Sequence, residues 1–287
     1  MAAQKNPKLT IIIVTHNSAA VIHDCLKEIS DSPYPIIIVD CDSSDNAIAE
    51  IKQKYPNIKI IASEKNLGYG RANNLGATHA ESDYLLFLNP DAIIQHQDIS
   101  LAVKMLDTHS QIGVAGVQIK GEEGYAGVKD GNLLYKSSIL GAVFFVKVAL
   151  FTQLQGFDEK IFLYGEENDL CSRVEKAGFK NAVILDAQAS HINRGSSPNK
   201  WQYDYLRGYH SCWSKLYLRQ KRKGLYKTSY IILKFMIRSF ILLLISLATL
   251  DKHKAAWYMG GVSGSINFML GRKAFDKHNN PRGFIKI

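Results

Sequence analysis

Residues 9–17 of this chain read LTIIIVTHN, and this stretch decides the fold. Its first six residues form a short, continuous, largely β-branched apolar run, which is typical of a strand buried in a parallel sheet. Apolar residues at helical spacing follow at positions 21–29, and a second apolar run follows at 36–40. The chain therefore opens with a predicted strand, helix and strand, the unit from which parallel sheets are built.

The alternation continues, with predicted helices at residues 47–55 and 71–79 and predicted strands at 58–62 and 84–88. It indicates an α/β fold with a mostly parallel sheet flanked by helices. Further elements are expected: a helix at 98–109, strands at 113–119, 138–146 and 182–185, a mobile glycine-rich loop at 121–127, and a helix at 201–223. We expect an α/β domain at residues 1–200 and a separate helical region at 201–287.

The composition is that of a folded protein. An apolar content of 46% in 287 residues is enough to bury a substantial core. The four cysteines lack C-x-x-C spacing, so neither a zinc site nor a disulfide framework is predicted. No secretory signal is recognisable, and a cytoplasmic protein with reduced thiols is expected.

Positive charge is concentrated toward the C-terminus. Residues 200–287 carry 17 Lys and Arg against 3 Asp, whereas residues 1–199 carry 18 basic and 23 acidic residues. Basic segments bind phosphate groups, either those of nucleic acid or those of an anionic membrane surface. The same region contains a long apolar run, which a surface for nucleic acid does not need. An anionic membrane surface is therefore a predicted partner, and nucleic acid is not.

That apolar run, residues 228–250, is long enough to span a bilayer, but Lys234 and Arg238 interrupt it. With basic clusters on both sides, it predicts an amphipathic helix lying in the membrane interface. A second segment at 255–272 adds apolar and aromatic surface. The protein is therefore expected to be peripheral on the inner face of the cell membrane. The alternative is that both segments pack onto the α/β domain or a partner subunit.

Residues 156–173, GFDEKIFLYGEENDLCSR, place Glu166, Glu167 and Asp169 within four positions after an apolar run. Like charges held this close raise one another's pKa, and folds tolerate them mostly where carboxylates bind a metal or transfer protons. The cluster also begins a predicted helix, so an acidic helix N-terminus with an Asp169–Arg173 pair is the alternative. All three carboxylates are candidate catalytic residues.

Two further segments have the composition of nucleotide-binding loops. A serine-rich turn with Asp40, Asp42 and Asp45 follows the second strand, where short side chains can bind a base, a ribose or only the turn itself. The segment at 66–76, NLGYGRANNLG, places Arg71 at a helix start, where it can bind a phosphate or be an ordinary surface residue. It lacks the dinucleotide fingerprint, and no such glycines follow the first strand, so an NAD enzyme is disfavoured.

Asn89 and Asp91 follow a buried strand, and Pro90 between them ends its ladder of hydrogen bonds. Oxygen ligands at this position, beside a diphosphate, suit Mg²⁺ or Mn²⁺; an ordinary strand-to-turn sequence is the alternative. His191 follows a later strand. A lone histidine is more often structural, but an imidazole beside Asp91 would suit Mn²⁺.

In this order the motifs resemble glycosyltransferase family 2, with its GT-A fold. The resemblance covers residues 9–195 and rests on these segments: THN, VDCDSSD, NLGYGRANNLG, LFLNPDA, Gly141-Ala142, GFDEKIFLYGEENDLCSR and His191. It is strongest to bacterial rhamnosyltransferase-like enzymes of polysaccharide and O-antigen assembly. It implies transfer of a sugar, L-rhamnose being one candidate, from a dTDP- or UDP-sugar to a glycan acceptor linked to polyprenyl diphosphate.

The resemblance also implies roles for individual residues. Those of the donor site would be Thr15, Asn17, Asp40 and Asp42 around the base and ribose, and Asn66, Arg71 and Asn73 along the base and diphosphate. Asn89-Pro90-Asp91 would stand for the family's Asp-x-Asp motif, and Asp91 with His191 would hold the divalent cation.

Glu166 and Glu167 would form the family's acidic dyad, whose second member serves as the base. Two departures are present: Asn89 replaces a charged ligand, and Glu167 is one methylene longer than the usual Asp.

The chemistry fits these implied roles. Transfer from a nucleoside diphosphate needs a base for the acceptor hydroxyl and a cation for the leaving diphosphate. With the base behind the anomeric carbon, attack is direct and the configuration inverts. Two alternatives stay open: a nucleotidyltransferase, which would normally carry a glycine-rich loop after the first strand, and a non-catalytic module that binds a nucleotide sugar or glycan without turnover.

Overall fold

The computed structural model describes residues 7–121, 126–192, 200–224 and 226–283, which fold into two compact units. Of the described residues, the first unit contains 7–65, 71–121, 126–157 and 167–192; the second contains 66–70, 158–166, 200–224 and 226–283. Two short segments from the predicted α/β domain therefore group with the C-terminal helices, and one of them ends at Glu166.

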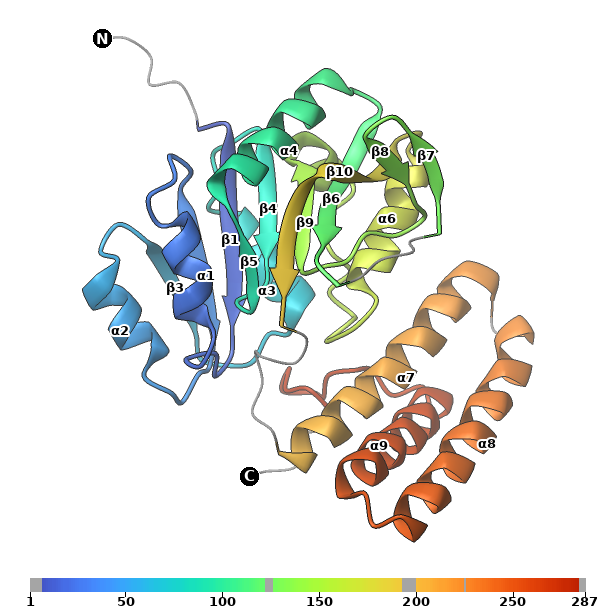
Figure 1. Ribbon diagram of the computed structural model, residues 1–287. Helices are drawn as coiled ribbons and strands as arrows, with labels where there is room; N and C mark the ends of the chain where they lie inside the picture. The colour runs from blue at the N-terminus through green and yellow to red at the C-terminus, as the bar shows by residue number, and fades with distance from the viewer. Residues whose placement is uncertain (1–6, 122–125, 193–199, 225, 284–287) are drawn as a thin grey trace, which may run out of the picture. The chain divides into compact units, whose positions relative to one another are not determined.

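The first unit is built on a ten-stranded sheet of order β3-β2-β1-β4-β9-β6-β10-β8-β7, with β5 pairing to β10 (Figure 1). Its strands are β1 Leu9–Thr15, β2 Ile36–Cys41, β3 Lys59–Ser63, β4 Tyr84–Leu88, β5 Ala92–Ile94, β6 Ile112–Ile119, β7 Val128–Asp130, β8 Leu133–Tyr135, β9 Val143–Lys147 and β10 Lys180–His191. Strands β1 to β4 pair in parallel, as do β6 and β10, whereas β9 is antiparallel to β4 and β6. The predicted α/β class with a mostly parallel sheet is confirmed.

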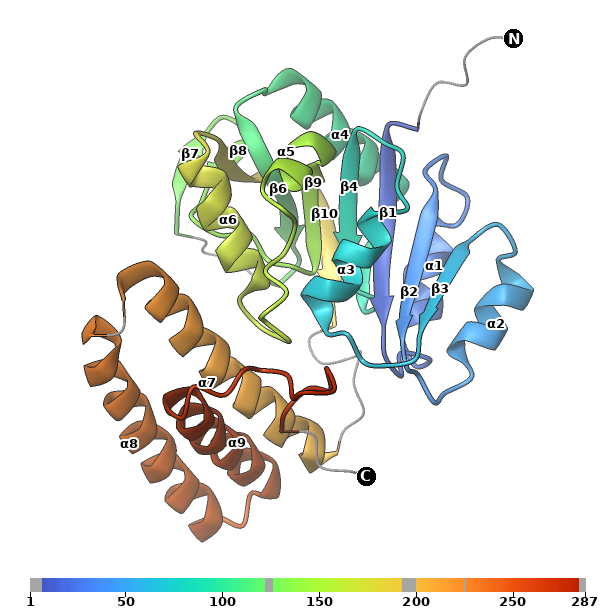
Figure 2. The same ribbon diagram turned by 180° about the vertical axis from the view of Figure 1, so that it is seen from behind.

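Helices cover both faces of the sheet. They are α1 Ile22–Ile29, α2 Ala47–Lys54, α3 Tyr69–Ala77, α4 His96–Thr108, α5 Val148–Gln153 and α6 Glu166–Lys176. Helices α1 and α4 lie in front of the sheet in Figure 1, and α3, α5 and α6 lie in front in the reversed view of Figure 2. Side chains that alternate along the strands fill both layers, because successive residues point to opposite faces.

On the α1 and α4 side, Leu9, Ile11 and Ile13 belong to one continuous apolar core. On the α5 side, four phenylalanines pack with ring centroids 5.0–6.3 Å apart: Phe87, Phe144, Phe151 and Phe157. Helix α3 lies so close to β1 that a Cβ on Gly76 would be 2.6 Å from Ile12. These two cores fix the strand ends that carry the candidate site.

Most predicted elements are confirmed with ends shifted by a few residues, but two strands were wrong in extent. The strand expected at 138–146 occupies only Val143–Lys147, because Ile139 leaves the ladder and packs over Gly116, where a Cβ would be 2.6 Å away. The strand expected at 182–185 runs from Lys180 to His191 through a register shift after Ile184. Residues 122–125 of the loop expected at 121–127 lie outside the described residues.

The second unit contains α7 Trp201–Lys223, α8 Tyr226–Ala248 and α9 Lys252–Met269. The helices predicted at 201–223 and within 228–250 are thereby confirmed, and most of the apolar segment at 255–272 is helical as well. Its apolar core joins Phe162 from the segment 158–166 to residues of α7 and of the C-terminal segment; these are Leu206, Tyr209, Trp213, Ala274 and Phe275. Among the described residues, one helix is long and apolar enough to cross a membrane, over Tyr230–Ala248 of α8.

Candidate active site

Three parallel strands end at the same edge of the sheet. Thr15 at the end of β1 is the register partner of Asp40 in β2, and Ile13 pairs with Leu88 at the end of β4. The polar segments after these strands therefore meet at the carboxyl edge, where open α/β sheets bind ligands. The sequence-based expectation that residues 15–17, 40–42 and 89–91 come together is confirmed in that sense.

Asp40 ties the loops after β1 and β2 to each other. Its carboxylate accepts hydrogen bonds from the hydroxyl groups of Thr15, at 2.9 Å, and Ser43, at 2.5 Å. The carboxylate is 7% exposed, so these bonds satisfy a group that burial would otherwise destabilise. Asp40 thus stabilises the turn. The serine-rich composition had allowed this structural role as well as ligand binding.

Asn17 is the second link between these loops. Its backbone N–H donates to Oγ of Ser43 at 2.9 Å, and its side-chain oxygen accepts from the backbone N–H of Ser44 at 2.8 Å. Both Asn17, with φ of 54°, and Asp42, with φ of 59°, adopt the left-handed conformation that few residue types tolerate. Asp42 is exposed, so its carboxylate is open to a ligand.

Asp91 and His191 form a pair at the end of β4. Nε2 of His191 lies 3.3 Å from Oδ1 of Asp91, and the Asp91 side chain is 2% exposed. The pair exists because β5 runs antiparallel to β10, with His191 opposite Ala92, and because the Asp91 carbonyl accepts from the N–H of Ile192. The predicted neighbourhood of these two side chains, 100 positions apart, is confirmed.

The thiol of Cys25 lies near Asp91 and is unreactive. It donates to the carbonyl of Asn89 at 3.8 Å. Burial, and secondly the charge of Asp91, raise the pKa of Cys25 well above its ordinary value, so the thiol stays protonated. Asn89 itself is half-buried, and its N–H donates to the carbonyl of Ala142, which fixes the start of the turn.

The donor atoms present fit a divalent cation that shares its coordination with a diphosphate. Among the described residues no group of three or more His, Cys, Asp and Glu side chains could hold a metal ion. One carboxylate and one imidazole are, however, the kind of partial set that Mn²⁺ accepts, and Mg²⁺ is commonly held by one or two carboxylates plus phosphates and water. The remaining positions would then belong to the substrate.

The other predicted donor residues lie in helix α3 or in the turn before it. Asn66 accepts a hydrogen bond from the N–H of Gly68 at 3.0 Å, which shapes the turn that leads into the helix. Arg71 in the first turn is half-buried, and Asn73 is 1% exposed. Neither side chain is on the open surface, and the structure places both in the part of α3 that belongs to the first unit.

Asn74 was not singled out from the sequence, yet it makes a two-bond clamp. Its amide nitrogen donates to the carbonyl of Phe157 at 2.9 Å, and its amide oxygen accepts from the N–H of Phe157 at 2.8 Å. This pairing fixes the chain just before the segment 158–166. The signal available in the sequence was only the pair of adjacent asparagines after Arg71.

The three clustered carboxylates of α6 differ in their surroundings. Glu166, the first helical residue, is 1% exposed, whereas Glu167 is half-buried with Oε1 accepting from the amide of Asn168 at 3.2 Å. Asp169 is 3% exposed and is paired with Nε of Arg173 at 2.7 Å.

The guanidinium of Arg173 makes two hydrogen bonds in addition to the predicted pair with Asp169. Its two terminal nitrogens donate to the carbonyls of Leu154 and Gly156, at 2.7 and 2.8 Å. One arginine thereby closes the carbonyl end of α5 and neutralises Asp169. The structural alternative predicted for Asp169, a pair with Arg173 at i,i+4, is present.

The segment before the dyad turns sharply. Tyr164 and Gly165 both have positive φ, 72° and 95°, so the chain reverses directly before Glu166. Helix α7 holds this segment: Oγ of Ser214 donates to the carbonyl of Leu163 at 3.0 Å. At the other end of the segment, the Phe162 carbonyl accepts from the N–H of Tyr69 at 3.2 Å, and Gly68 packs so closely that a Cβ would be 2.2 Å from that oxygen.

Comparison with known proteins agrees with this arrangement. The profile of glycosyl transferase family 2 matches residues 10–153. The N-acetylglucosaminyl-diphospho-decaprenol L-rhamnosyltransferase of Mycobacterium tuberculosis is 23% identical over 274 residues, covering 75% of this chain and 89% of that protein. The rhamnosyltransferase WbbL of Escherichia coli K12 is 26% identical over 218 residues, covering 63% of this chain and 82% of WbbL.

A solved structure has the same fold. The mannosyltransferase PcManGT from Pyrobaculum calidifontis, solved in complex with GDP-Man and Mn²⁺, superposes with a TM-score of 0.59 at 14% identity, covering 91% of this chain and 88% of that one. The matched profile spans half of the chain and includes the strands and loops that carry the Thr15–Asp40 link and Asp91. The chain therefore belongs to glycosyl transferase family 2 and is a nucleotide-sugar-dependent glycosyltransferase with a GT-A fold.

Proposed function

We propose that this chain transfers a sugar, with L-rhamnose as the first candidate, from a dTDP- or UDP-sugar to a lipid-linked glycan during synthesis of a bacterial surface polysaccharide. The names of its relatives support glycosyl transfer in such synthesis. The Mycobacterium relative, which aligns over 89% of its own length, is named for a diphospho-decaprenol acceptor, and this supports an acceptor of the polyprenyl-diphosphate class.

The Asp91–His191 pair is the observation that carries the proposal. It combines a buried carboxylate and an imidazole at the carboxyl edge, next to the Asp40 and Asn17 loops. We assign the donor's base and ribose to these loops, with Arg71 and Asn73 toward the diphosphate. Asp91 and His191 would hold the Mg²⁺ or Mn²⁺ ion, which when bound neutralises charge on the leaving diphosphate.

The chain's own residues divide the remaining work. Glu167 accepts the proton of the acceptor hydroxyl as that oxygen bonds to the anomeric carbon, and the bond from that carbon to the diphosphate oxygen breaks. Attack from the side opposite the leaving group inverts the anomeric configuration. Glu167 suits the role better than its neighbours because Asp169 is committed to Arg173 and Glu166 is fully buried.

A donor panel tests the proposal. The purified chain would be incubated with dTDP-L-rhamnose and a set of UDP-sugars, with N-acetylglucosaminyl polyprenyl diphosphate as the acceptor. We expect dTDP release and a product heavier by one deoxyhexose, with NMR showing an inverted anomeric linkage. Turnover with another donor would replace rhamnose. Binding of nucleotide without turnover of any donor would instead favour a binding module.

A further inference from the structure

The distribution of polar and apolar side chains on helix α8 is the reverse of that on a helix in water. Two of the residues it buries are Ser239, 8% exposed, and Ser246, 3% exposed. Six large apolar side chains, each at least half exposed, form what we call the outer face of α8: Leu233, Ile237, Phe240, Ile241, Leu244 and Ile245. In water the apolar stripe of a helix faces the core and polar residues face solvent. The arrangement in α8 suits an apolar surrounding.

Small residues make several of the closest contacts of α8 and α9 within this unit. Ser239 packs beside Gly261 of α9, where a Cβ would lie 3.4 Å from the serine oxygen. Helix α9 in turn contacts α7 through Gly260 and Gly264, where a Cβ would lie 2.0 and 2.2 Å from backbone carbonyls. Small residues that let backbones approach closely are typical of helix packing in lipid, where burying large apolar side chains brings no gain. The large side chains of α8 are left outside.

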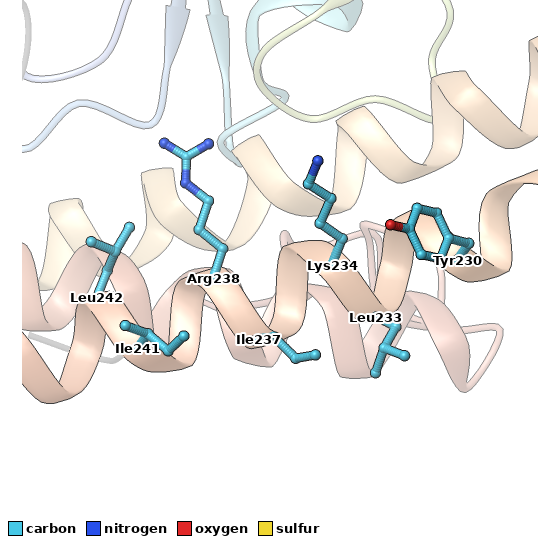
Figure 3. Close-up of a pocket in the computed structure, with 7 residues that line it drawn as sticks. All are labelled: Tyr230, Leu233, Lys234, Ile237, Arg238, Ile241 and Leu242. Atoms are coloured by element: carbon cyan, nitrogen blue, oxygen red, sulfur yellow. The ribbon is translucent and has the colours of Figure 1, made fainter.

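The charge beside the outer face has a single sign. Lys234 and Arg238 project from one side of α8, while Leu233 and Ile237 project from another, as Figure 3 shows. At 3.6 residues per turn, both cations lie along one edge of the outer face and the buried serines lie opposite it. Helix α8 contains no acidic residue, and these cations line a groove of about 470 Å³ together with apolar side chains of the same helix.

An apolar surface bordered by positive charges, with no negative charge among them, is complementary to a bilayer with anionic headgroups. Lys and Arg extend their charged ends to lipid phosphates while their carbon stems follow the apolar surface. The basic residues that end α7, Lys221 to Lys223, and those that begin α9, Lys252 and Lys254, extend the positive charge at both ends of α8. The excess of 17 basic over 3 acidic residues in this region agrees.

We propose that the outer face of α8 inserts into the hydrocarbon edge of an anionic bilayer, with Lys234 and Arg238 binding lipid phosphates. This docking surface lies outside the donor site and needs none of its residues. It would bring the chain to the membrane that holds a lipid-linked acceptor.

Vesicle flotation of the full-length chain tests the charge requirement. Vesicles of phosphatidylcholine alone would be compared with vesicles containing one third phosphatidylglycerol. Removing two cations at a membrane surface in the variant Lys234→Gln/Arg238→Gln should weaken binding to the anionic vesicles about 30-fold. The matched control Lys52→Gln/Lys104→Gln removes two exposed lysines of the first unit and should bind like the wild type. Equal loss in both variants, or in neither, overturns the proposal.

Insertion is tested by fluorescence. The tryptophan introduced by Ile241→Trp should shift its emission to the blue with anionic vesicles and be quenched by brominated acyl chains. The tryptophan introduced by Val128→Trp, exposed on the first unit, should do neither. Unshifted emission from the Ile241→Trp variant overturns insertion. A blue shift without lipid, accompanied by a dimer in sedimentation, would assign the face to a second copy of the chain. Donor hydrolysis without acceptor should be equal in all variants, which separates docking from chemistry.

Discussion

The hydroxyl of Tyr217 donates a 2.8 Å hydrogen bond to Oδ2 of Asp158, which also accepts from Nζ of Lys221 at 2.6 Å. Helix α7 thus holds the first residue of the segment that ends at Glu166, while Ser214 holds its middle. Burial disfavours the charged form of Asp158, but the bonds from Lys221, the Lys160 N–H and Tyr217 outweigh it and keep the pKa of Asp158 below its ordinary value. The carboxylate is therefore ionised at neutral pH and anchors the segment.

Tyr217→Phe should loosen this anchor without altering the helix. Loss of one hydrogen bond to a charged group lowers the free energy of unfolding by about 1–2 kcal/mol. We expect a lower melting temperature and a several-fold lower kcat, with the Kd for the donor nucleotide unchanged. Tyr258→Phe on α9 is the matched control and should change neither quantity. An unchanged kcat in Tyr217→Phe would show that α7 does not position the dyad.

Asp91→Asn should remove most activity and leave the fold intact, because it keeps the shape of the side chain and removes the negative charge that a divalent cation needs. The measurements are turnover with added Mn²⁺, the binding of Mn²⁺ in the presence of donor nucleotide, and circular dichroism. Near-normal turnover of the wild type in EDTA would contradict a metal role for this carboxylate.

Glu167→Gln should lower kcat by roughly 10²–10⁴-fold with little change in donor affinity, since it removes the base and keeps the shape. Asp169→Asn should act differently: it breaks the buried pair with Arg173, so the free energy of unfolding should fall by about 2–3 kcal/mol. Glu166→Gln completes the set. If Glu167→Gln keeps the wild-type kcat while one neighbour loses it, the base is that neighbour.

His210 predicts an acid sensitivity of the second unit. Burial, opposed only by the hydrogen bond from Nε2 to the Arg282 carbonyl, lowers the pKa of His210 to about 3. The unfolded chain binds a proton near pH 6.5 and the folded chain does not, so stability is complete above pH 6.5 and is lost as the pH falls toward 3. At pH 5 the loss is roughly 2 kcal/mol.

Two measurements check this prediction. In urea unfolding, the urea concentration at which the second unit is half unfolded should decrease when the pH is lowered from 7 to 5. NMR should show no titration of the His210 ring across that range. A ring that titrates near pH 6.5 in the folded chain would contradict it.

The sequence predicted those strands and helices that have a clear local pattern of apolar residues. Strands such as β1 and β4 are unbroken apolar runs, and their polar ends meet because parallel neighbours share an edge, so Asp40 and Asp91 could be placed in advance. Helices α7 and α8 were equally visible. The roles of individual site residues stay predictions, since neither strand pairing nor burial tests them.

What was missed depends on contacts distant in the chain. Strand β5 has only three residues, and nothing local shows that Ala92 pairs with His191. Strand β10 continues past its apolar run because Asp98 accepts a hydrogen bond from the N–H of Gln188 at 2.9 Å and holds the bulge. The Asn74 clamp on Phe157 likewise joins residues 83 positions apart. Such pairings are set by the assembled sheet and not by local preference.

The position of β10 inside the sheet also constrains the order in which a nascent chain can fold. The ribosome delivers β3, β2, β1 and β4 within the first 88 residues, so this half of the sheet can pair early. Strands β7 and β8 emerge after β5 and β6 but have no neighbour except each other until β10 arrives, and one edge of β6 stays unpaired until the same strand is made. Long-range pairings of this kind form slowly. Asp91 therefore acquires His191 only after about 100 further residues have been synthesised, and a chain stalled before that point would lack the Asp91–His191 pair.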